Sequence, residues 1–151
     1  MNEMYNMSIV THNYGVLAVL LAIGVNYYKL YTAKSVQAYR QFVMLFNAVG
    51  ATLLASVIFT GVIMMAAKHL SFTLENIVMI VFSIVFIILE GKRAKAFKYV
   101  MNKDMQGFLV FKEKAKKIFA FEFIATLIIY IWMVSIAKWY MSLMKMQAIN
   151  F

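Results

Sequence analysis

The chain has 151 residues, of which 64% are hydrophobic and 14% charged, and its formal net charge is +9. Soluble domains carry roughly 25% charged residues, so this composition excludes an ordinary soluble protein and indicates a single membrane domain over residues 1–151. The absence of cysteine from the sequence excludes disulfides, thiolate metal ligands and a cysteine nucleophile.

The first predicted element is an apolar helix over about residues 8–28. The preceding residues contain no Lys or Arg, unlike a cleavable signal peptide, so we expect this helix to be retained. His12, Gly15, Val19, Ala22 and Asn26 share one face at helical spacing, which predicts that this face points into a bundle. An ionisable residue inside a membrane span is a functional candidate. The alternative is that His12 lies at the membrane interface and bonds to its neighbours or to water.

The second predicted helix covers about residues 42–67 and carries a stripe of small residues at every fourth position. Small residues mark helix contacts in membranes, so we expect this stripe to pack against the first helix. It consists of Ala48, Thr52, Ser56 and Thr60. His69 follows at the same end as His12, and two neutral imidazoles on one side of a bundle are possible ligands of haem iron or another metal.

The third and fourth helices are predicted over about residues 72–90 and 118–141, and each has a polar face. On the third these residues are Asn76, Ser83 and Glu90; on the fourth they are Glu122, Thr126 and Tyr130. Two interpretations of the carboxylates stay open. They form ion pairs with Arg40, Lys92 or Arg93 that hold the helices together, or one buried carboxylate relays protons or holds a cation.

The Lys and Arg residues are distributed unevenly along the chain. None precedes the first segment, the three connections contain 3, 1 and 9, and the last two, Lys138 and Lys145, lie near the end of the fourth segment and beyond it. Positive residues favour the cytoplasmic side, so the first and third connections are predicted to be cytoplasmic and both termini to lie outside. The predicted fold is therefore an all-α, polytopic four-helix transmembrane bundle with a long basic hairpin between its third and fourth helices.

The basic hairpin is also a candidate contact surface. Four of its lysines lie directly before the fourth span: Lys112, Lys114, Lys116 and Lys117. Basic residues beside a membrane attract anionic lipids, at about 1 kcal/mol each, so we expect these lysines to contact anionic lipid or an acidic partner. The topology already explains their charge, and no nucleic-acid partner is predicted.

Several of these residues occur in an order that is similar to a known family. His12 opens the first helix in THNYGVLAVLLAIGV, Arg40 precedes the second in YRQFVMLFNAVGATLL, a glycine lies late in it in FTGVIMM, and Glu122 opens the fourth in AFEFIATLIIY. The chain thereby resembles, in outline, the HemJ-type protoporphyrinogen oxidases and related CopD-like membrane proteins. The resemblance implies His12 as a ligand of haem b, with Arg40 and Glu122 as polar site residues. The chain lacks the family's proline-containing segments and has SFTLEN at the entry to the third helix.

Two functional hypotheses follow for a protein expected in the bacterial inner (plasma) membrane. The first is a non-catalytic subunit or interaction partner in a larger membrane complex, in which other subunits or further copies of the chain bind to it. The second is a haem- or quinone-associated redox protein, with His12 and His69 as cofactor ligands. Neither an enzymatic reaction nor a substrate is indicated by the sequence.

Overall fold

The computed structural model describes residues 2–67, 73–101 and 104–149. In these residues the chain forms four α-helices: α1 (Asn2–Thr32), α2 (Val36–Ala67), α3 (Leu74–Lys98) and α4 (Met105–Ile149). Within the described residues, each helix has a segment that is long and apolar enough to cross a bilayer. The structure therefore confirms an all-α fold and indicates an integral membrane protein.

The helices continue beyond the apolar segments into the polar residues that flank them. Lys, Gln, Arg, Glu and Ala are good helix formers, so the change from lipid to water does not end a helix. Polar caps mark the starts of three helices instead. The Ser35 hydroxyl accepts from the Ala38 N–H, the Thr73 hydroxyl from the Asn76 N–H, and the Asp104 carboxylate from the Gly107 N–H at 2.8 Å. Helix α4 thereby begins at Met105 and takes in the whole lysine-rich segment.

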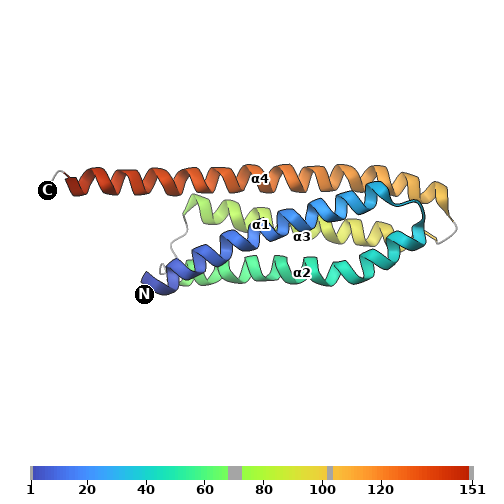
Figure 1. The fold of residues 1–151 in the computed structure, drawn as a ribbon, viewed down its shortest axis with the longest axis horizontal. Coiled ribbons are helices and arrows are strands. Elements are labelled where there is room, and N and C mark those ends of the chain that lie inside the picture. Colours follow the sequence, from blue (N-terminus) through green and yellow to red (C-terminus); the bar gives the residue numbers. More distant parts are fainter. Residues whose placement is uncertain (1, 68–72, 102–103, 150–151) are drawn as a thin grey trace.

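The four helices run antiparallel in chain order, so that the start of α1 and the end of α4 lie at the same end of the bundle (Figure 1). Helix α1 packs along both α2 and α4, and α3 packs against α4. The 45 residues of α4 span about 67 Å, and its C-terminal part extends beyond the other helices (Figure 1).

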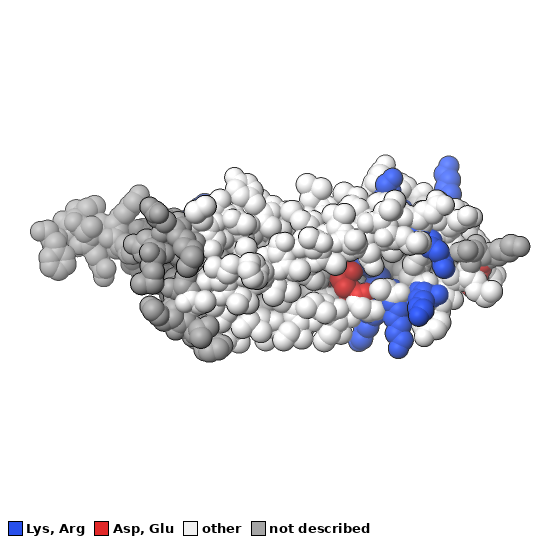
Figure 2. Space-filling model, turned by 90° about the horizontal axis from the view of Figure 1, so that it is seen from below, with Lys and Arg blue, Asp and Glu red and all other residues white. Residues whose placement is uncertain are grey.

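The best-packed part of the molecule lies where α1 passes into α2 and α3 into α4. An aromatic cluster of Tyr39, Phe97, Phe108 and Phe111 is buried there, with Tyr39 edge-on to Phe97 at 5.1 Å between ring centroids. Lys and Arg side chains gather around this same end, which we call the basic end (Figure 2). The buried core continues from this cluster toward the middle of the bundle, where it includes Val19, Ile23 and Phe86.

The contact between α1 and α2 differs from the predicted one. Of the predicted stripe on α2, Thr60 faces α1, whereas Ala48, Thr52 and Ser56 are exposed. The contact uses the neighbouring face, where a Cβ on Gly15 would lie 2.8 Å from the Val57 side chain. The reason is that larger α2 residues, including Leu53, Leu54 and Val57, fill the space beside α1 and α4.

Candidate functional site

A buried ionic cluster of Arg93, Glu90 and Glu122 joins α3 to α4 near the basic end. Arg93 Nη2 donates to Glu90 Oε2 one turn earlier on α3. Arg93 Nη1 lies 3.6 Å from Glu122 Oε2 on α4, and its guanidinium carbon lies 4.0 Å above the Phe119 ring. Glu122 is 1% exposed and Arg93 is 7% exposed. The cluster thus places one buried guanidinium between the buried carboxylate of Glu122 and the partly exposed carboxylate of Glu90.

The polar atoms of this cluster are incompletely paired. Arg93 Nη1 and both carboxylate oxygens of Glu122 have no hydrogen-bond partner among the described residues. Two ionised carboxylates beside one guanidinium would leave one negative charge in excess, which is costly in a nonpolar environment. The arrangement can therefore hold one proton or one monovalent cation on Glu122. This geometry keeps open both interpretations of the carboxylates, an ion pair between helices and a proton or cation site.

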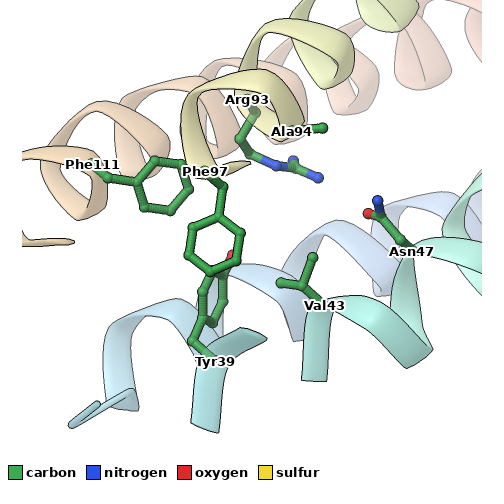
Figure 3. Close-up of a pocket in the computed structure, with 7 residues that line it drawn as sticks. All are labelled: Tyr39, Val43, Asn47, Arg93, Ala94, Phe97 and Phe111. Carbon is green, nitrogen blue, oxygen red and sulfur yellow. The ribbon is translucent and has the colours of Figure 1, made fainter. Parts of the chain in front are cut away.

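A small hollow lies beside the cluster, between α2, α3 and α4. The guanidinium of Arg93 points into it toward Asn47 on α2, and the rings of Tyr39 and Phe97 form its floor (Figure 3). Its volume of about 10 Å³ is the room that one water needs. The hollow is therefore too small for a cofactor in this conformation.

Arg40 does not join this cluster. Its Nη2 donates to the Val100 carbonyl in the α3–α4 turn at 2.5 Å, and its guanidinium lies 5.4 Å from the centroid of the Phe97 ring. The sequence placed Arg40 at the level of Glu90 and Glu122. The structure uses it instead to fasten the start of α2 to the end of α3.

His12 is buried at the other end of the bundle. Its ring faces α2, where Nδ1 lies 3.0 Å from the Thr60 hydroxyl, and it is 6% exposed. Val19 and Ala22 are buried on the same face of α1, so the predicted inward face is confirmed. The hydrogen-bond partner of the His12 ring is thus Thr60 on α2 rather than a neighbouring residue of α1.

The surroundings of His12 do not fit a haem. Its ring packs against α2 so closely that a Cβ on Gly61 would lie 3.5 Å from its Cε1 atom. One turn further along α1, Gly15 approaches Val57 even more closely, so a porphyrin would require α1 and α2 to separate. His69 lies outside the described residues. Within those residues, no group of three or more His, Cys, Asp or Glu side chains could hold a metal ion.

The four lysines of the predicted contact surface have different surroundings. Lys112 donates to the carbonyl oxygens of Tyr31 and Ala33, at 2.7 and 3.3 Å, and so binds the C-terminal end of α1. Lys116 pairs with Glu113 at 3.0 Å. Lys114 and Lys117 are exposed. Lys112 and Lys116 therefore have contacts within the fold, whereas Lys114 and Lys117 are available to other molecules.

The sequence predicted an inward position for His12 and a polar face containing Glu122, but it did not single out Arg93 from Arg40 and Lys92. The sequence did contain an indication of the Glu90–Arg93 pair, because the two residues are three apart, the spacing at which opposite charges on a helix meet. The aromatic cluster was also missed, since its four rings come from three separate segments. Comparisons with protein-family models, curated proteins and solved structures give no match.

Proposed function

We propose that this protein is a non-catalytic subunit or interaction partner of a membrane complex, and that α2 is the helix that binds the partner. The observation that carries the proposal is the outward face of α2. Its middle, beside the exposed Val49, is rich in small exposed residues: Ala48, Ala51, Thr52, Ala55 and Ser56. We call this set the outer small face.

The outer small face differs from the lipid-facing surfaces of the other helices. Their exposed residues at comparable positions are large and branched or aromatic: Leu17 and Leu21 on α1, Ile84 and Ile87 on α3, and Phe123 and Leu127 on α4. Large side chains fill the space between lipid chains, whereas small ones let two helix backbones approach closely and gain van der Waals contact. The outer small face is therefore suited to another transmembrane helix.

The hydroxyl groups on this face do not require a polar partner. Thr52 donates to the Ala48 carbonyl at 2.8 Å, and Ser56 donates to the Thr52 carbonyl at 2.9 Å. These bonds within the helix remove the cost of placing a hydroxyl in lipid. Close packing would then supply the association energy, and the partner helix could come from a second copy or from another subunit. The expected setting is the plasma membrane, with the basic end cytoplasmic.

The test is photocrosslinking in intact membranes. A photoreactive phenylalanine derivative at Ala55 should give a discrete adduct, whereas the same group at the exposed Ile84 of α3 should give none. Adding Ser56→Leu should reduce the Ala55 adduct at least fivefold, because a leucine keeps the backbones apart. Phe59→Leu, one turn away and also exposed, is the matched control and should leave the adduct unchanged.

Two results would contradict this function. One is the absence of an Ala55 adduct in membranes in which the protein is folded, and the other is equal loss of the adduct in Ser56→Leu and Phe59→Leu. The mass of the adduct distinguishes a second copy from another subunit. An absorption spectrum of the purified protein tests the redox hypothesis separately, since a Soret band that His12→Ala abolishes would support haem binding instead.

A further inference from the structure

A second apolar surface lies between α1 and α4, away from the outer small face of α2. It is a groove of about 320 Å³, within the range of roughly 300–1,000 Å³ of pockets that hold organic ligands. Gly24 and Tyr27 of α1 and Phe119, Ala120 and Ile124 of α4 are among its lining residues. Gly24 has open space where a Cβ would stand, so the groove owes part of its depth to that glycine.

One end of this groove is basic. Tyr31 follows Tyr27 by one turn of α1, and Lys116 precedes Ala120 by one turn of antiparallel α4. The ammonium groups of Lys116 and Lys112 lie 5.3 and 6.0 Å from the centroid of the Tyr31 ring. Both acceptors of Lys112 are neutral carbonyls, so they do not neutralise its charge. Two ammonium groups thus stand directly beyond the basic end of the apolar groove. That of Lys116 is paired with the Glu113 carboxylate at 3.0 Å, so Lys112 carries the uncompensated charge.

We infer that this groove binds one anionic phospholipid, with an acyl chain along Gly24 and Ala120 and the phosphate beside Lys112 and Lys116. The charge pattern of α4 supports a lipid as the occupant. Residues 112–117 carry four lysines and one glutamate, whereas residues 118–137 carry a single charge, Glu122. The change from apolar groove to basic end therefore coincides with the change from the hydrocarbon region to the headgroup region of a membrane. This inference does not depend on the proposed role of α2.

Native mass spectrometry of the detergent-purified chain tests the site with two lipids that have identical palmitoyl and oleoyl chains, a phosphatidylglycerol and a phosphatidylcholine. One phosphatidylglycerol should bind at least about tenfold more tightly than one phosphatidylcholine, because two lysines contribute to the first alone. Lys112→Gln with Lys116→Gln should reduce this preference to below about threefold. If the double variant does not fold, Lys116→Gln alone should halve the preference or reduce it further.

Two controls separate the site from general attraction between charges. Lys92→Gln with Lys95→Gln removes two exposed lysines of α3 and should leave the preference intact. Gly24→Leu fills the groove and should weaken binding of both lipids at least fivefold, whereas Gly91→Leu, at an exposed glycine of α3 with open space around it, should not. Equal binding of the two lipids by the unmodified chain would overturn the inference. The inference would also be overturned if the α3 control variants lost as much lipid preference or lipid binding as the matching site variants. A dimer of the chain that Gly24→Leu abolishes would overturn it as well.

Discussion

At the scale of single residues, Arg93 organises the charged interior. It bonds to Glu90, lies 3.6 Å from Glu122 and stacks on Phe119 at 4.0 Å, so it connects α3 to α4 by two kinds of contact. Helical periodicity placed Glu122 on a polar face of the fourth helix. It could not select the partner of Glu122, because that choice depends on how α3 is rotated about its axis relative to α4. Arg40 and Arg93 were equally plausible partners until the fold placed the Val100 carbonyl beside Arg40.

The two residues of the Arg93–Glu122 ion pair should respond differently to substitution. Arg93→Met leaves two carboxylates without a counter-charge, one of them fully buried, and should lower the free energy of unfolding by about 3–5 kcal/mol. Glu122→Gln should change it by less than about 1 kcal/mol, because the carboxylate oxygens accept no hydrogen bond that the amide would lose. Unfolding of each variant in the same detergent, followed by circular dichroism, measures both values.

A matched control for Arg93 is Lys116→Met, which breaks the more exposed pair with Glu113. Such pairs contribute about 0–1 kcal/mol, so this variant should stay close to the unmodified protein. If Arg93→Met and Lys116→Met lost the same stability, the buried pair would not be the contact that holds α3 against α4.

At the scale of elements, hydropathy located all four helices but not their ends. The predicted segments 8–28 and 42–67 lie inside α1 and α2. Helices α3 and α4 continue into polar residues that are too hydrophilic to be counted in an apolar segment. Periodicity identified the stripe of Ala48, Thr52 and Ser56 as a packing surface but could not say what it packs against. Small residues suit a helix of the same chain and a helix of a partner equally well, so only the folded arrangement shows that these three face outward.

The aromatic cluster should matter more for the stability of the helix pairs than lipid-facing rings do. Phe108 is 1% exposed and has Tyr39 and Phe111 as neighbours, at 6.0 and 6.4 Å between ring centroids. Phe108→Ala should cost about 3–5 kcal/mol, because it leaves a cavity where α2, α3 and α4 meet. Phe121→Ala, on the exposed face of α4, should cost less than about 1 kcal/mol in detergent. Comparable losses in the two variants would show that the core is not at the basic end.

At the scale of the whole molecule, the bundle is long and loosely closed. Its accessible surface is 10650 Å², whereas a compact soluble protein of 17.4 kDa exposes about 7,900 Å². Exposed large apolar side chains occur on all four helices, where lipid or partner helices can cover them. A chain that has its aromatic cluster at the basic end and presents long exposed apolar helix faces suits the role in assembly that we propose.

We expect the basic end to set the orientation of this molecule in the membrane. The first and third connections contain three and nine Lys or Arg residues, the second contains one and the N-terminal segment none, and the fold brings the first and third together at one end. Moving that many positive residues across a bilayer is unfavourable, so we expect the basic end to stay in the cytoplasm. Because the chain has no cysteine of its own, single cysteines report this orientation without background labelling.

A cysteine at Asn2, in the first turn of α1, should react with an impermeant maleimide added to intact cells. A cysteine at Gln106, an exposed position in the first turn of α4, should react only after the cells are permeabilised. Placing Lys residues at Asn2 and Asn6 should weaken the charge asymmetry and make part of the Gln106 population reactive from outside, because positive charge at the N-terminus then competes with the basic end for the cytoplasmic side. Labelling of Gln106 in intact cells without those lysines would reverse the assigned orientation.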